Sequence, residues 1–101
     1  MKINAAFLFV VPEAEQDRYE TAIDTPAINM IFMGVKSYEE AAKAALELAD
    51  GRGVTAIELC AGFGHRGVAM VSEAVGGKAS VGVVRFDHHP SIGFKSGDAF
   101  F

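Results

Sequence analysis

Apolar runs and amphipathic segments alternate along the chain. Residues 3–11 (INAAFLFVV) are uncharged and mostly apolar, without regular alternation, and they predict a strand buried on both faces. Residues 28–35 (INMIFMGV), 54–60 and 80–86 have similar character and predict three further strands. Residues 13–22 are polar and acidic, and we interpret them as a short helix or a loop.

An amphipathic helix is predicted to begin after Ser37. Ser37 and Glu40 form a capping box, in which each side chain can bond a free backbone N–H of the first turn. Apolar residues then recur at the spacing of one buried helix face: Tyr38, Ala41, Ala42, Ala45, Leu48 and Ala49. A second helix is expected over residues 66–75, and the two glycines that follow predict its end.

This order of elements predicts the fold class. Strands that alternate with helices favour a mainly parallel sheet with right-handed crossovers. We therefore predict a single α/β domain over residues 1–87, with a small four-stranded sheet and two or three helices. The C-terminal tail, residues 88–101, is expected to pack on the domain or on a partner subunit. If residues 13–22 are not helical, the first two strands pair antiparallel and the fold is an α+β sandwich.

The composition narrows the classes of partner. A chain of 101 residues corresponds to one domain. Its net charge is −4 and it has no cluster of Lys and Arg, so nucleic-acid binding is not expected. The longest uncharged run, residues 25–35, is far shorter than the roughly 20 residues that span a bilayer, so we expect no membrane partner.

Cysteine use and sheet edges add two expectations. Cys60 is the single cysteine, and residues 1–15 lack the cleavage site of a signal peptide, so a reducing cytoplasmic location is predicted. Exposed edges of a small apolar sheet favour homo-oligomerisation. The terminal pair Phe100–Phe101 either contributes to that contact or folds back on its own core.

A glycine-rich loop separates the third strand from the second helix. Gly62, Gly64 and Gly67 have the spacing G-x-G-x-x-G, and free N–H groups at a helix start suit a phosphate or carboxylate. Asp87 follows Gly67 by twenty residues, as the ribose-binding acid does in a dinucleotide fingerprint. Only fourteen residues follow Asp87, however, so full dinucleotide binding is disfavoured. In the alternative interpretation, the glycines allow a sharp turn and close packing of strand and helix.

Titratable residues near this loop are candidates for chemistry. Glu58 and Arg85 lie on neighbouring predicted strands, and they form either an ion pair that fixes the register or a pair that orients a ligand. Cys60 ends a strand close to the start of a helix, where a thiol can become nucleophilic, with His65 as its base. The alternative for Cys60 is a small core residue.

The histidines are expected to gather at one end of the sheet. His65, His88 and His89 all lie in two loops that follow neighbouring strands. Together with Asp87 they form a weak candidate for a divalent-metal site, but their spacing matches no recognised motif, and we predict no metal. His65 is the better candidate for acid–base chemistry or for a hydrogen bond to a ligand. No cofactor is identified from the sequence.

Three segments together suggest a family. INAAFLFVVPEA, ELCAGFGH and GVVRFD resemble a family of small prokaryotic proteins classed as a domain of unknown function, with an E-L-C-x-G-F-G-H motif. The resemblance implies that two family motifs are present, one holding Glu58, Cys60, Gly62, Gly64 and His65, the other Arg85 and Asp87. The tail after residue 87 lies outside the pattern. No established activity comes with the resemblance.

Three functions remain open. The leading hypothesis is binding of a small polar or anionic molecule at the strand-to-helix loop, by Gly62, Phe63, Gly64, His65, Arg66, Arg85 and Asp87. The second is a small hydrolase, lyase or isomerase of a carbonyl compound, whose catalytic candidates are Cys60, His65 and Glu58, or else a metal held by His65, Asp87 and His88. The third is a structural or interaction module without a ligand.

Overall fold

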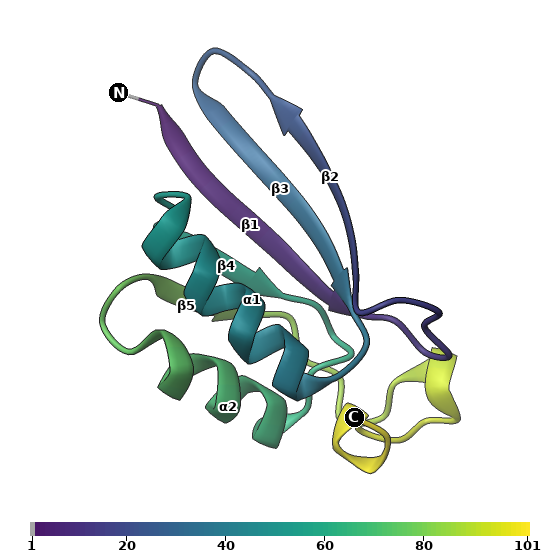
Figure 1. Cartoon of the computed structure of the whole chain (residues 1–101). Helices are drawn as coiled ribbons and strands as arrows, with labels where there is room; N and C mark the ends of the chain where they lie inside the picture. Colours follow the sequence, from purple (N-terminus) through teal and green to yellow (C-terminus); the bar gives the residue numbers. More distant parts are fainter. Residues whose placement is uncertain (1) are drawn as a thin grey trace.

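One mostly parallel sheet with two helices forms the molecule (Figure 1). We analysed a computed structural model that describes residues 2–101. The sheet has five strands in the order β2-β3-β1-β4-β5, and only β2 is antiparallel to its neighbour. The elements are β1 (Ile3–Val10), β2 (Arg18–Asp24), β3 (Ile28–Val35), α1 (Tyr38–Gly51), β4 (Ala56–Leu59), α2 (His65–Val75) and β5 (Ser80–Val83). The predicted α/β fold is confirmed.

Half of the segment predicted as a short helix or loop, residues 18–22, belongs to an additional strand, whereas residues 13–17 form a loop. β2 begins at Arg18, includes residues 18–22 of that segment and pairs antiparallel with β3, so the sheet has five strands rather than four. β1 and β3 therefore pair in parallel, not antiparallel as the alternative expected. A charged residue such as Arg18 is typical of a solvated segment, which is why the sequence did not indicate this strand. In the structure Arg18 is paired with α1, because it contacts Glu40 at 3.2 Å and also contacts Glu47.

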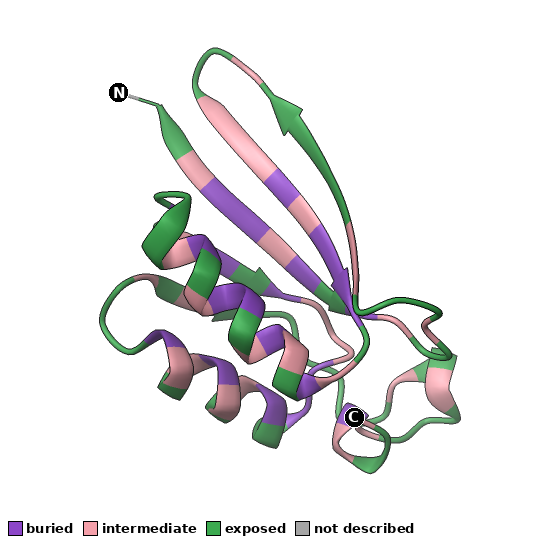
Figure 2. Ribbon diagram, viewed as in Figure 1, coloured by how far each residue is buried: buried purple, intermediate pink, exposed green. Residues whose placement is uncertain are grey.

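Both helices cover the same face of the sheet, and the core lies between the two layers (Figures 1 and 2). Alternate strand residues face this core, including Leu8 of β1 and Ile57 of β4, both with no exposed surface. Its largest fully buried side chains are Tyr38, Phe63, Leu8, Ile31, Leu48, Ile57 and Leu59. Of the helix face predicted from the sequence, Tyr38, Ala41, Ala45 and Leu48 are buried, whereas Ala42 and Ala49 are half-buried and the unpredicted Ala44 is buried.

The start of α1 is capped from one side only. The Ser37 hydroxyl accepts from the Glu40 backbone N–H at 3.1 Å, as predicted. The Glu40 carboxylate contacts Arg18 of β2, so it serves the sheet edge rather than the capping box. Within residues 2–101, no helix is long and apolar enough to cross a membrane.

Candidate functional site

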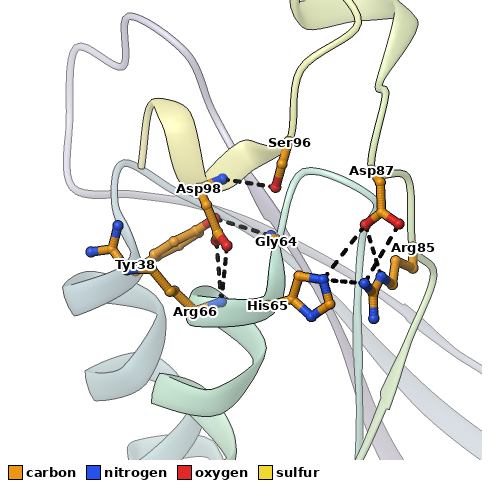
Figure 3. Close-up of polar contacts among 8 residues, drawn as sticks. All are labelled: Tyr38, Gly64, His65, Arg66, Arg85, Asp87, Ser96 and Asp98. Carbon is orange, nitrogen blue, oxygen red and sulfur yellow. Dashed lines mark hydrogen bonds and ion pairs between the residues drawn. The ribbon is translucent and has the colours of Figure 1, made fainter.

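The N-terminus of α2 lies against the C-terminal tail. Gly64 is the N-cap residue and has no side chain with which to cap the helix. The carboxylate of Asp98, from the short 3-10 helix Gly97–Ala99, takes this place (Figure 3). It accepts from the backbone N–H of Arg66, with 3.2 Å to each oxygen. The anion expected at this helix start is therefore supplied by the chain itself.

Tyr38 joins α1, the glycine loop and the tail. Its buried hydroxyl donates to Asp98 at 2.9 Å and accepts from the Gly64 N–H at 3.0 Å. Its ring stacks on Phe63 with 5.7 Å between centroids, and lies 6.3 Å from the ring of Phe101. Burial, reinforced by the neighbouring carboxylate, raises the pKa of Tyr38 to about 12. Tyr38 consequently stays a neutral donor at ordinary pH.

Asp98 is held in its ionised form. Burial opposes its ionisation, but hydrogen bonds from the Arg66 N–H, the Tyr38 hydroxyl and the Gly67 N–H outweigh that effect. The pKa of Asp98 therefore lies below its ordinary value of 3.8. A carboxylate at this position also interacts favourably with the positive end of the helix dipole.

Two glycines of the G-x-G-x-x-G sequence are explained by close packing. A Cβ at Gly64 would overlap the carboxylate of Asp98. A Cβ at Gly67 would lie 2.5 Å from the ring of Tyr38, closer than real Cβ contacts. Gly64 thus leaves space for the tail, and Gly67 allows α1 and α2 to approach each other.

His65, Arg85 and Asp87 form a second group beside the loop (Figure 3). Arg85 Nε donates to Asp87 Oδ1 at 2.9 Å, and Arg85 Nη2 donates to His65 Nε2. His65 Nε2 lies 3.8 Å from Asp87 Oδ1. The hydrogen bond from Arg85 holds the pKa of Asp87 below its ordinary value. The structure brings these three predicted residues together, but on the surface, where the charge of Arg85 is already balanced.

The predicted Glu58–Arg85 ion pair is not formed among residues 2–101. Glu58 is exposed and faces Gly82 in the parallel register of β4 and β5. Arg85 lies two residues beyond the end of β5 and contacts His65 at the start of α2 instead. The sequence predicted Arg85 within a strand over residues 80–86, but β5 ends at Val83, and the sequence could not show which positions of β4 and β5 face each other.

A cavity lies at the carboxyl ends of β1 and β4. The loop after β1 leads to one edge of the sheet, and the loop after β4 leads towards the other edge, which is where open α/β sheets bind ligands. The cavity measures about 220 Å³ and is lined by Val10, Pro12, Cys60, Gly62, His89, Ser91, Ile92 and Phe101. A neighbouring apolar cavity of about 380 Å³ shares Pro12, Ile92 and Phe101 with it.

The polar groups of the 220 Å³ cavity come from the loop and the tail. Cys60 Sγ accepts from the Gly62 N–H at 3.2 Å. His89 Nδ1 accepts from the Ser91 N–H at 3.1 Å, so the neutral imidazole carries its proton on Nε2. The sequence placed His89 only in the weak candidate metal site and not in this cavity, since no local pattern shows that the tail folds back over the strand ends.

The other predicted site residues are more scattered. Phe63 is part of the core and Arg66 contributes its backbone N–H to Asp98, while the side chain of His88 is exposed. Across residues 2–101, no group of three or more His, Cys, Asp or Glu side chains is arranged to hold a metal ion. Of the weak metal candidates, His65 and Asp87 both hydrogen-bond to Arg85.

Comparison with known proteins agrees with the family resemblance found in the sequence. Comparisons with curated proteins and with solved structures each found no match. The profile of a family described as "Family of unknown function (DUF6506)" matches residues 3–99, which is nearly the whole chain. The match includes residues 88–99, so the expectation that the tail lies outside the family pattern was wrong. The chain therefore belongs to this family of unknown function.

Proposed function

We propose that the protein binds a small molecule in the cavity between the carboxyl ends of β1 and β4, under the C-terminal tail. The observation that carries this proposal is the cavity itself, whose lining combines apolar residues with Cys60, His89 and Ser91. Ligand sites in proteins have this composition, mostly apolar with a few polar groups that fix orientation. The position, at diverging loops beyond parallel strands, favours the same function.

The lining groups indicate the class of ligand. The polar side chains among the lining residues are the imidazole of His89 with its Nε2–H, the hydroxyl of Ser91 and the thiol of Cys60, and no Asp or Glu of residues 2–101 is among them. These donors suit a carbonyl or carboxylate group, and the apolar residues Val10 and Ile92 suit a small hydrocarbon body. A volume of about 220 Å³ corresponds to about seven water molecules, so the ligand has few non-hydrogen atoms.

The proposed ligand site involves the same loop as the anion site predicted from the sequence, but a different part of it. At the start of α2, an external phosphate would have to displace the carboxylate of Asp98. We therefore place the ligand at the beginning of the loop, against Cys60 and Gly62. His65 and Arg85 are not among the residues that line the cavity, and we assign them to holding the chain after β5 beside the start of α2.

Amide chemical shifts in NMR titrations test the proposal. Butyrate, benzoate and benzaldehyde at up to about 10 mM cover the expected ligand class, and even weak binding is detectable at this concentration. We expect shifts at Cys60, Gly62 and Ile92, and their loss in His89→Ala. His88→Ala, at the neighbouring exposed position, is the matched control and should bind as the wild type does. Shifts that are absent for every probe, or that are equal in both variants, contradict the proposal.

A second candidate is an enzyme that uses Cys60 as a nucleophile. The specific observation is that Cys60 and His89 line one cavity, which could place a carbonyl carbon beside a thiol and an imidazole. The rate of alkylation by iodoacetamide at about pH 6.5 tests it, because an activated thiol reacts faster than free cysteine there. A rate no higher than that of free cysteine excludes this role and leaves the binding function unaffected.

A further inference from the structure

The sheet has one face without a helix. Within residues 2–101, both helices lie on the face to which Ala6, Leu8 and Val10 of β1 point (Figure 1). The residues between them in sequence point to the opposite face. Mostly parallel sheets are normally covered on both faces, because their strands are apolar on both sides. The uncovered face of this sheet, which we call the open face, is therefore unusual for a molecule that acts alone.

The open face is apolar and continuous across three strands. Strand register places Phe7 of β1 beside Phe32 of β3, with ring centroids 6.3 Å apart. Three side chains of this face are exposed large hydrophobic residues, namely Ile3 at 53%, Phe9 at 37% and Ile23 at 59%. The strand residues that alternation places here over β1, β2 and β3 are Ile3, Ala5, Phe7, Phe9, Tyr19, Thr21, Ile23, Ile28, Met30, Phe32 and Gly34.

Charge is nearly absent from the open face. Among the strand residues that alternation places on it, Glu58 of β4 is the only charged one. Its neighbour on the edge strand is Gly82, which has no side chain to cover it. The strand residues of the open face on β1 and β3 are thus uncharged, and the exposed Glu58 lies next to Phe7 on the β4 side, with open space over Gly82 beyond it.

The size of the open face matches what a small specific dimer needs. The five strands contain 31 residues, and each covers about 16 Å² of a sheet, from a rise of about 3.3 Å and a strand spacing of about 4.8 Å. The face therefore measures about 500 Å², and two such faces would bury about 1,000 Å², which is the lower bound for specific interfaces.

We propose that a second copy of the chain covers the open face, so that the protein is a two-fold dimer with its two sheets packed face to face. An identical partner presents the same uncharged centre, and stacking Phe7 and Phe32 of one copy on those of the other buries aromatic rings at the middle of the contact. Glu58 is the β4 neighbour of Phe7 and borders this centre, and the space over Gly82 lets its carboxylate extend towards solvent at the β5 edge of the contact. Two sheets packed in this way lie about 10 Å apart and share one core.

Light scattering and sedimentation of matched variants test the dimer. The wild type should show twice the chain mass of 10.7 kDa at about 200 μM. Ile23→Lys places a charge on the open face at a residue already exposed in the monomer, and should weaken association about tenfold or more. Val83→Lys, at an exposed residue that alternation assigns to the helix-bearing face, is the control and should remain dimeric. Circular dichroism confirms that each variant is folded.

A wild-type experiment makes the test independent of the variants. Isotope-filtered NMR on mixed labelled and unlabelled protein should detect contacts between copies from the Phe7 and Phe32 rings. A monomer at about 200 μM overturns the proposal, whatever other partner the face binds. A dimer whose contacts between copies arise from the exposed tail residues Phe94 and Phe100 also overturns it.

Discussion

Replacing Asp98 with alanine removes the carboxylate that the tail places on the N-terminus of α2. This group accepts from the Arg66 N–H at 3.2 Å and from the Tyr38 hydroxyl at 2.9 Å. Hydrogen bonds to charged groups contribute about 1.5–3 kcal/mol each, and solvent screening reduces this value for partly exposed groups. Because Asp98 is half-buried, we expect Asp98→Ala to lower the free energy of unfolding by about 2 kcal/mol in total.

The same carboxylate makes the stability depend on pH. Its pKa in the folded protein is below the ordinary value of 3.8, so the unfolded chain binds the proton more readily. The stabilisation by the ionised Asp98 carboxylate is complete above the ordinary pKa of 3.8, which the unfolded chain keeps. It is lost as the pH falls through the lower pKa of the folded protein. The difference in stability between the wild type and Asp98→Ala should consequently be larger at about pH 7 than at about pH 2.

Urea unfolding at both pH values, followed by circular dichroism, measures this difference. Asp87→Asn is the matched control, because the pKa of Asp87 is also lowered but its carboxylate is exposed and bonded to an exposed Arg85. We expect no measurable change in stability for that variant. If Asp98→Ala is as stable as the wild type at neutral pH, the tail does not hold the start of α2, and the cavity beneath it has no fixed cover.

Three further substitutions test the packing around this site. Tyr38→Phe leaves the buried Gly64 N–H without its acceptor and should cost about 1–3 kcal/mol in urea unfolding. Gly67→Ala forces a Cβ against the Tyr38 ring and should cost about 1–3 kcal/mol, whereas Gly77→Ala, with open space around it, should cost nothing measurable; equal thermal stability of these two variants would refute the close-packing explanation. Leu8→Ala, at a fully buried position under the helices, should cost about 2–5 kcal/mol, and a smaller loss would contradict the assignment of the core face.

Much of the fold follows from local pattern in the sequence. β1, β3 and α1 are predictable because uninterrupted apolar runs and a regular helical stripe reflect burial directly. β2 was not predictable in the same way, because its Arg18 and Glu20 resemble the residues of a solvated segment. In the folded protein they bond Glu40 of α1 and Arg52 just after it, contacts that lie 22 and 32 residues away in sequence.

The site was less predictable than the fold, for the same reason. The glycine spacing correctly marked the β4–α2 connection, but the anion that fills it is Asp98, 32 residues beyond Arg66. His89 reaches the cavity only because the tail turns back over the strand ends. No local signal encodes either contact, since both depend on the position of a segment that follows the last strand.

Binding of benzoate to the wild type and to a cavity-filled variant tests the central claim most directly. Cys60→Leu adds a larger apolar side chain to a half-buried position in the cavity wall and removes space for a ligand. We predict amide shifts around Cys60 and Ile92 in the wild type, and their loss in Cys60→Leu, with circular dichroism showing that the variant is folded. Equal binding by both proteins, or no binding by the wild type at about 10 mM, would contradict the proposed function.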